Sequence, residues 1–340
     1  MKKPIKQLPT FAWRTYRGGA MIKDYLGITP KEDTFYPEDW ISSFVEAKNK
    51  NYVENEGITR VMYNGEEKLI TEVVSTDDFG EGRTDSGVLI KFLDAAERLG
   101  IQVHPTKDYA KQIFGSNYGK TECWHILGTR NMGEPAVIYL GFKEYVTKEL
   151  WKELFEKQDI KGMLNAMHRF EVKKGDTILV TGGTPHAIGA GCFLLEIQEP
   201  SDYTMRTEKV TVAGDTLTPM QIHYGVGEEK MLDCFDYTPK SREEIKEKFF
   251  LKARKTENSN IISLVTYDDT PCFALEQIKC DQINFKKPHF VTLIATKSGG
   301  SMKYEGGEFA LNRGDKFFIP ANTEVTIKIA EGLICYPPRK

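Results

Sequence analysis

From about residue 69 onward, the sequence is a succession of short apolar runs that end at turn-forming residues. Gly, Asp, Thr and Pro separate runs at 88–92, 100–104, 122–127, 136–142, 177–180 and 192–198. Many short strands joined by turns are typical of a β-sandwich or jelly roll. We therefore expect a mainly β fold, preceded by residues 1–60 as an irregular stretch with short elements.

Helical patterns interrupt the β pattern. Thr147 predicts an N-cap for a helix over 148–157, and Asp159 predicts the cap of a second helix. A third helical region covers about 218–254, where Ser241-Arg242-Glu243-Glu244 forms a capping-box pattern. A short apolar helix is also expected around 20–26. The β pattern returns after residue 257.

Two domains are expected, because 340 residues exceed what one hydrophobic core usually serves. An internal repeat supports them: 174–180 aligns with 313–319, each a Gly-Asp turn that leads into a strand. In this alignment Val325 stands where the first copy has His186. We therefore predict a first domain over 1–240 that carries the candidate metal-binding residues described below. A second domain over 255–340 binds no metal, and the boundary between the two lies near 240–258.

Composition narrows the classes of partner. The chain is 40% hydrophobic and 28% charged, which indicates a globular protein. A net charge of −3 gives no overall positive field for nucleic acid or for an anionic membrane. The six cysteines form no CxxC pair. No apolar segment follows the N-terminal lysines as a secretory signal would, and no apolar segment is long enough to span a bilayer. Reduced thiols and a cytoplasmic location are expected.

Four polar residues at strand ends suggest a metal site. Gln102 and His104 are two residues apart on a predicted strand, so they share one face. Glu122 begins another strand, and His186 lies at a corner set by Gly182, Gly183 and Pro185. A mixed set of nitrogen and oxygen ligands suits a divalent ion that keeps an open coordination position. Each residue alone has an ordinary structural explanation; the combination favours a metal.

The same residues resemble a known family. The segments 87–95 and 101–105 are similar to the lysine strand and the Q-x-H-P strand of type I phosphomannose isomerases. Lys120-Thr121-Glu122 resembles the family's K-[TP]-E segment, and 184–191, 195–198 and 201–206 resemble its third signature. The similarity is clear over about 87–206 and extends to a second cupin at about 290–320.

This resemblance implies two cupin-like jelly-roll barrels with helical insertions, and one Zn²⁺ or another divalent metal per chain. It places the metal ligands at Gln102, His104, Glu122 and His186. It assigns catalytic roles to Arg206, Lys120 and Asp202, and substrate-binding roles to Lys91 and Arg206. The implied reaction interconverts mannose 6-phosphate and fructose 6-phosphate.

The chemistry of these residue types agrees with that reaction. Aldose–ketose isomerisation moves a proton between adjacent carbons through a cis-enediol, which needs a base and stabilisation of developing negative charge. Lys120 could be the base if the cation and partial burial lower its pKa. Arg206 could hold either the phosphate or the enediolate. The sequence does not decide between these roles.

Other interpretations stay open. Ile41 stands where the family usually has glutamate, Arg17 where tryptophan is common, and Thr207-Glu208-Lys209-Val210 departs from the usual stretch after Arg206. A different sugar phosphate, a non-catalytic sugar-binding cupin and a cupin metal oxygenase are the alternatives. The oxygenase is disfavoured because Gln102 replaces its first histidine and Glu122 follows His104 at a long distance. A small-molecule partner and a monomer or dimer are expected.

Overall fold

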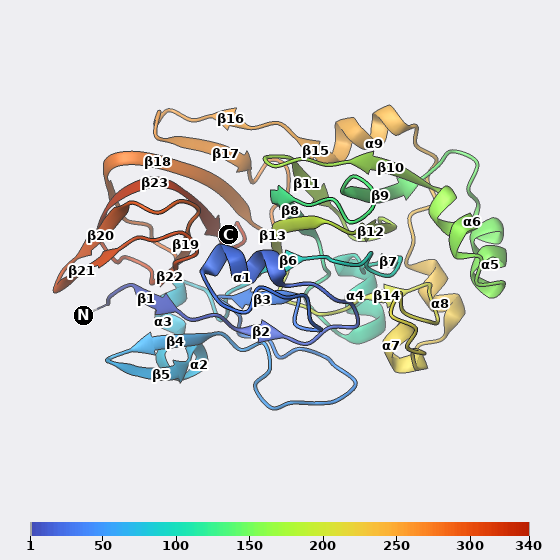
Figure 1. Cartoon of the computed structure of the whole chain (residues 1–340), viewed down its shortest axis with the longest axis horizontal. Helices are drawn as coiled ribbons and strands as arrows, with labels where there is room; N and C mark the ends of the chain where they lie inside the picture. The colour runs from blue at the N-terminus through green and yellow to red at the C-terminus, as the bar shows by residue number, and fades with distance from the viewer. Residues whose placement is uncertain (1, 340) are drawn as a thin grey trace.

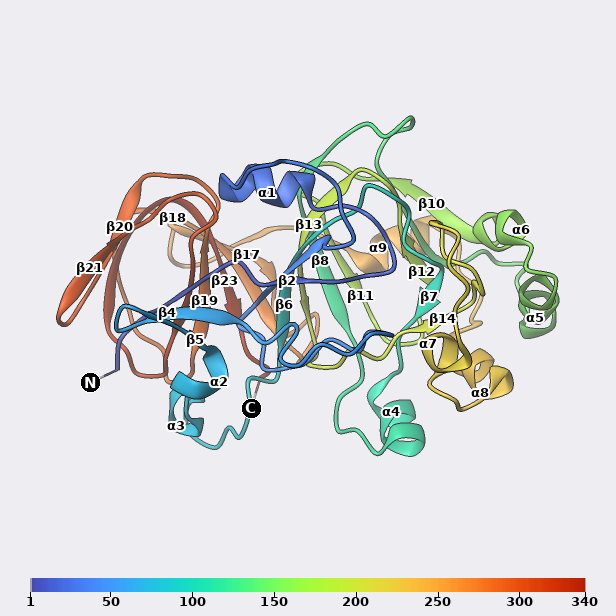
Figure 2. The ribbon, with the colours of Figure 1, turned by 60° about the horizontal axis from the view of Figure 1, so that its bottom comes forward.

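The structure, a computed structural model, describes residues 2–339. Two β bodies lie side by side along the long axis, with the C-terminal strands at one end and α5 to α8 at the other (Figures 1 and 2). The expected mainly β fold with helical insertions is confirmed. No helix in this part of the chain is both apolar enough and long enough to cross a membrane.

The first body consists of two antiparallel sheets that enclose a core. The seven-stranded sheet has the order β15 (Phe250–Leu251), β11 (Thr177–Val180), β8 (Glu122–Thr129), β13 (Cys192–Gln198), β6 (Leu89–Asp94), β3 (Glu38–Ile41) and β2 (Phe11–Ala12). The five-stranded sheet has the order β10 (Met167–Glu171), β9 (Val137–Phe142), β12 (His186–Ile188), β7 (Gln102–Val103) and β14 (Met205–Arg206). Side chains of both sheets, among them Trp124, Leu140 and Ile178, pack in one apolar cluster.

The second body is built on an 11-stranded sheet. Its main path is β16 (Arg254–Lys255), β17 (Ile261–Val265), β18 (Ala274–Phe285), β23 (Val325–Tyr336), β19 (Val291–Ala295), β22 (Lys316–Ile319), β1 (Ile5–Gln7), β4 (Arg60–Tyr63) and β5 (Glu66–Leu69). Strand β20 (Gly300–Tyr304) pairs with β23, and β21 (Gly307–Ala310) pairs with β20. N-terminal strands thus extend a sheet of the C-terminal part, and the division into 1–240 and 255–340 stays a prediction.

The helices lie at the edges of the two bodies. They are α1 (Ala20–Leu26), α2 (Ile70–Val73), α3 (Thr76–Phe79), α4 (Lys107–Phe114), α5 (Lys148–Glu156), α6 (Ile160–Asn165), α7 (Pro219–His223), α8 (Glu228–Asp233) and α9 (Arg242–Phe249). The predicted N-caps are confirmed: Thr147, Asp159 and Ser241 each accept a hydrogen bond from a backbone N–H of the first turn. The helical region expected over 218–254 is three short helices, α7 to α9, followed by two short strands.

The internal repeat has a structural counterpart. Strands β11 and β22 are both fully buried, and each follows a glycine of positive φ, Gly175 at 94° and Gly314 at 88°. In each turn an aspartate side chain accepts a backbone N–H three residues back: Asp176 from Lys173 and Asp315 from Asn312. Val325 packs in the apolar core of the second body, which leaves no polar ligand at that position.

Candidate metal centre and active-site pocket

Strand register brings the predicted residues to one end of the first body. On β12 and β7, His186 is the direct partner of Gln102, and Arg206 of β14 is the partner of Gln102 on its other side. On the opposite sheet, Glu122 begins β8, and Lys91 of β6 is the partner of Glu196 on β13. The site therefore lies where the two sheets open, at the end of their shared core.

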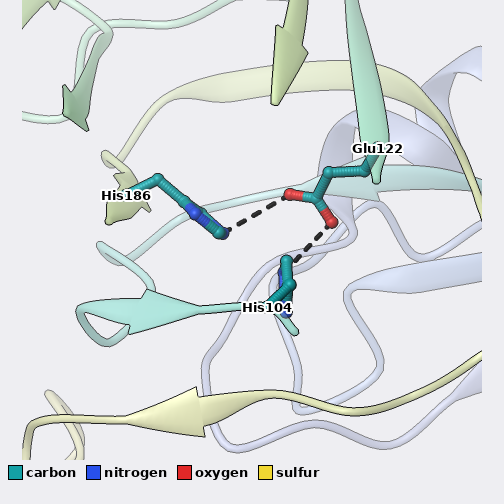
Figure 3. A group of neighbouring side chains, drawn as sticks. All are labelled: His104, Glu122 and His186. Atoms are coloured by element: carbon teal, nitrogen blue, oxygen red, sulfur yellow. Dashed lines mark ion pairs between the residues drawn. The ribbon is translucent and has the colours of Figure 1, made fainter. Parts of the chain in front are cut away.

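His104, Glu122 and His186 converge on one point (Figure 3). His104 Nε2 lies 3.1 Å from Glu122 Oε2, and His186 Nε2 lies 3.4 Å from Glu122 Oε1. All three residues are almost fully buried. Among residues 2–339, they form the one group of three or more His, Cys, Asp or Glu side chains whose ligand atoms lie within 4.8 Å of one another.

The two histidines present lone pairs to this point. His104 Nδ1 lies 2.9 Å from the Tyr203 carbonyl oxygen, and His186 Nδ1 lies 2.8 Å from that of Thr184. A carbonyl only accepts, so both rings carry their proton on Nδ1 and leave Nε2 unprotonated. Burial, then Lys120, lowers the pKa of His104 to about 3, and burial also lowers the pKa of His186. Two neutral imidazoles fixed by backbone carbonyls are typical of metal ligands.

Glu122 supplies negative charge at the same point. Trp124 Nε1 donates to Oε1 at 3.1 Å, whereas Oε2 is buried and has no hydrogen-bond partner. The nitrogens of His104 and Lys120 lie within ion-pair distance of Oε2, but neither has hydrogen-bond geometry. Buried polar atoms are rarely left unpaired, so a carboxylate with one imidazole lone pair near each of its oxygens fits a divalent cation. The donor set is that of a metal cofactor.

Glycines allow three loops to meet at this site. A Cβ on Gly119 or on Gly182 would lie 2.7 Å from the Pro105 carbonyl oxygen. That carbonyl accepts the backbone N–H of Lys120, and the His104 carbonyl accepts that of Gly183. The glycines therefore let the segments that carry Lys120 and His186 pack directly against the His104–Pro105 strand end.

Gln102 is close to the site but faces it with its nitrogen. Gln102 Nε2 lies 3.2 Å from His186 Nε2 and donates to it. An amide binds a metal through its oxygen, so a ligand role requires the amide group to turn by half a rotation. Gln102 as the fourth ligand stays a prediction.

Two buried lysines line the cavity beside the metal point. Lys120 Nζ lies 2.9 Å from His104 Nε2 and 3.3 Å from Glu122 Oε2. Lys91 Nζ lies 3.2 Å from Glu196 Oε1 and 3.7 Å from Glu38 Oε2. Burial alone would lower the pKa of Lys91, but Glu38 and Glu196 reverse this and raise it. Lys91 is therefore a charged group held by two carboxylates.

Lys91, Lys120, Asp202 and Arg206 line one small cavity of about 50 Å³, together with Gln102. Arg206 Nη1 donates to the backbone carbonyls of Gln221 at 2.7 Å and Thr204 at 3.2 Å. Asp202 accepts the backbone N–H of Lys48 and lies 3.7 Å from Arg14 Nη2. Five of the candidate residues thus line this cavity, and Lys120 connects it to the His104–Glu122–His186 point.

Sequence reasoning missed the charged network behind Lys91. Arg14 Nε donates to Glu38 Oε2 at 2.9 Å, and Tyr16 Oη donates to Glu38 Oε1 at 2.8 Å. Burial raises the pKa of Glu38, yet Arg14 and Lys91 overcome it and hold the pKa well below its usual range. Glu196 lies within the family-like segment 195–198, and Glu38 lies two residues before Trp40 in the sequence. For Arg14 the sequence offers no signal beyond its position near Gly18-Gly19.

Known proteins point to one family. The family model described as "Phosphomannose isomerase type I, catalytic domain" matches residues 6–122. A probable mannose-6-phosphate isomerase of Bacillus subtilis, GmuF, is 29% identical over 99% of this chain and 100% of its own length. Another B. subtilis mannose-6-phosphate isomerase, ManA, is 33% identical over 60% of each chain.

Solved structures of such enzymes share the fold. A B. subtilis mannose 6-phosphate isomerase superposes with a TM-score of 0.73 at 23% identity, over 98% of this chain and 99% of that one. A zinc-bound mannose 6-phosphate isomerase gives 0.74 at 14% identity, over 98% and 99%. The ordered motifs, the buried His-Glu-His group and a relative matched over its whole length agree: the chain is similar to type I phosphomannose isomerases in sequence and shares the fold of solved mannose 6-phosphate isomerases.

Proposed function

We propose that this protein interconverts mannose 6-phosphate and fructose 6-phosphate by moving a proton between C1 and C2 through a cis-enediol. The proposal rests on one observation above all: His104, Glu122 and His186 converge on one point, and Lys120, which contacts two of them, lines a cavity together with Lys91 and Arg206. The name and full-length coverage of GmuF, together with the name of ManA, support the same activity.

We assign the metal as Zn²⁺, held by His104, Glu122 and His186 with Gln102 as the fourth ligand. Neutral imidazoles, one carboxylate and one amide suit zinc with an open position. The bound ion would polarise the substrate's C1 and C2 oxygens and stabilise negative charge that develops there. The zinc-bound structural relative supports this choice of ion.

Lys120 is the proton-transfer group of this proposal. Lys120 is buried and borders the cavity, and its Nζ lies 2.9 Å from His104 Nε2 and 3.3 Å from Glu122 Oε2. A group at that place reaches the carbons whose oxygens face the metal. Lys91, by contrast, is held as a cation by Glu38 and Glu196, so it donates hydrogen bonds to substrate hydroxyls.

Arg206 and Asp202 complete the site in different ways. Arg206 is anchored through Nη1 to two carbonyls, which leaves the rest of its guanidinium to bind an anionic part of the substrate. Asp202 is engaged with Arg14 and with the backbone of Lys48. We therefore interpret Asp202 as a positioning residue that holds these two segments together.

A coupled assay with a chelator tests the proposal. Protein stripped with a chelator should not convert mannose 6-phosphate to fructose 6-phosphate, and one equivalent of Zn²⁺ should restore turnover. Glu122→Gln should abolish both metal retention and turnover, whereas Glu308→Gln, on exposed β21, should change neither. Binding of the sugar phosphate without turnover by the zinc-loaded protein would favour the non-catalytic alternative and reject the proposal.

The proposed activity also bears on the partner of this protein and on its location in the cell. A small sugar phosphate is the proposed partner. All six cysteines are unpaired and buried, which agrees with reduced thiols. The cytoplasmic location and the monomer or dimer state stay predictions.

A further inference from the structure

A second and larger cavity adjoins the metal cavity. Its volume is about 410 Å³, within the roughly 300–1,000 Å³ of small-molecule sites. The two cavities share Arg14, Thr15 and Arg206 in their walls. The inner cavity, at about 50 Å³, is much the smaller, so a hexose phosphate that reaches the metal must extend into the outer one.

The outer cavity is lined by four cations and by no acid. The cations are Arg14, Lys48, Lys50 and Arg206. This local excess contrasts with the net charge of −3 for the whole chain. Of these residues, Lys48, Lys50 and Arg206 have no ion-pair partner among residues 2–339, whereas exposed Lys152, Lys157 and Lys297 all pair with a glutamate. Cations gathered without acids make a local field for an anion.

Lys48, in the wall of the outer cavity, is held in place by residues just behind it. Its backbone N–H donates to Asp202 Oδ2 at 3.1 Å, and its Nζ lies 4.2 Å from the centre of the Tyr203 ring. Glu56 fixes the same loop by accepting from Trp13 N at 2.7 Å and from Asn49 Nδ2 at 2.8 Å. The ammonium group is thus positioned over an aromatic face and keeps its donors available.

Arg14 supplies an independent sign of a missing ligand. It is only 9% exposed, and its Nε and Nη1 are bonded to Glu38 and Asn49. Its Nη2 is buried and lies 3.7 Å from Asp202 Oδ1, too far for a hydrogen bond, so this donor has no hydrogen-bond partner although Arg14 lies in the wall common to both cavities. A buried guanidinium donor is costly when unpaired, so the site is built for an acceptor placed between the cavities.

We propose that the outer cavity binds the phosphate group of the substrate, with Lys48 and Lys50 as its specific contacts and Arg14 and Arg206 at the boundary to the sugar. This inference rests on the proposed isomerase activity for the identity of the sugar. It fixes an orientation: C1 and C2 lie at the metal, and the C6 phosphate lies toward the 48–50 loop. Selection for a phosphorylated sugar is then a property of this loop.

The test is the double variant Lys48→Met/Lys50→Gln, which keeps side-chain size and removes two charges. Loss of two charged contacts made equally in ground and transition states should raise KM for mannose 6-phosphate by roughly tenfold or more, with kcat unchanged. The inhibition constant of inorganic phosphate should rise in parallel. Lys303→Met, an exposed lysine on β20, is the control and should change neither constant. Unchanged KM and unchanged phosphate inhibition in the double variant would overturn the inference.

Calorimetry separates this inference from the proposed function. Inorganic phosphate should bind the wild type and bind the double variant more weakly, while unphosphorylated mannose binds both alike. These titrations need no turnover, so they decide the phosphate site even if mannose 6-phosphate proves not to be the substrate. Equal phosphate affinity for wild type and double variant would reject the site whatever the enzyme's activity.

Discussion

Gln102 and His186 are direct partners across β7 and β12, and their Nε2 atoms lie 3.2 Å apart. This pairing keeps a neutral amide beside the metal point in either of two amide orientations. In one, Gln102 donates to His186; in the other, its oxygen faces the metal. The role of Gln102 can therefore be decided by replacing the amide with groups that keep or lose the oxygen.

Gln102→Leu should lower metal affinity by about 10–100-fold, since either orientation of the amide supports the metal site. Gln102→Glu keeps an oxygen and should retain the metal. Competition with a fluorescent chelator measures both. If the leucine variant binds the metal as tightly as the wild type, Gln102 is neither a ligand nor a support for His186.

Lys91→Met should destabilise the fold strongly because Glu196 and Glu38 would keep buried charge beside an apolar side chain. Removing one partner of a buried pair costs about 3–5 kcal/mol. The double variant Lys91→Met/Glu196→Gln should recover part of this loss, since it also removes a carboxylate. Chemical denaturation measures the apparent free energy of unfolding.

The matched control for this prediction is Lys297→Met. Lys297 also pairs with a glutamate, its Nζ lying 2.8 Å from Glu331 Oε2, but its side chain is 57% exposed. An exposed pair contributes about 0–1 kcal/mol, so this variant should be nearly as stable as the wild type. Similar losses for Lys91→Met and Lys297→Met would mean that the buried network stabilises the protein no more than a surface pair does.

Glu38 should make stability depend on acid pH. Arg14 and Lys91 hold its pKa well below the ordinary 4.5 despite burial. A lowered pKa in the folded state contributes stability above the unfolded value, and this contribution is lost as pH falls through the folded value. The difference in melting temperature between the wild type and Glu38→Gln should therefore be largest above pH 4.5. The two melting temperatures should converge as the pH falls below 4.5. Parallel curves between pH 6 and pH 3 would contradict the assignment.

The metal group was predictable from the sequence because its members sit in local patterns. The i, i+2 spacing put Gln102 and His104 on one face, and Gly182, Gly183 and Pro185 marked the turn before His186. Strands β11 and β13 and the caps at Thr147, Asp159 and Ser241 also have the predicted limits. Local turn and cap chemistry determines such features, so a single sequence carries them.

Features that depend on long-range register were not predictable in the same way. Glu38 reaches Lys91 only because β3 lies beside β6, where Trp40 is the partner of Lys91, and Arg14 reaches Glu38 because β2 pairs with β3. Ile5 of β1 pairs with Phe318 of β22, which joins the two ends of the chain in one sheet. None of these pairings leaves a local sequence signal, because strand neighbours are chosen by the packing of the whole core. The phosphate-binding proposal depends on this long-range order.

Gly182→Ala should disturb the metal centre through the backbone alone. A Cβ at position 182 would lie 2.7 Å from the Pro105 carbonyl oxygen and 2.8 Å from Thr106, both in the segment that follows His104. Backbone cannot yield as a side chain can, so the turn that carries His186 must move away from His104. We expect about 1–3 kcal/mol of destabilisation, a typical cost of overpacking, and a faster release of metal to a chelator.

Gly128→Ala is the matched control for this change. Neither glycine has a left-handed backbone, but the Cβ at 128 would meet the flexible end of Met21 at 3.2 Å and the Phe193 ring at an ordinary contact distance of 3.7 Å. The control should therefore keep its metal as long as the wild type does. Because Gly182 touches no substrate and carries no ligand atom, a metal release rate in Gly182→Ala equal to that of Gly128→Ala would show that the close contact at Pro105 does not set the distance between the two histidines.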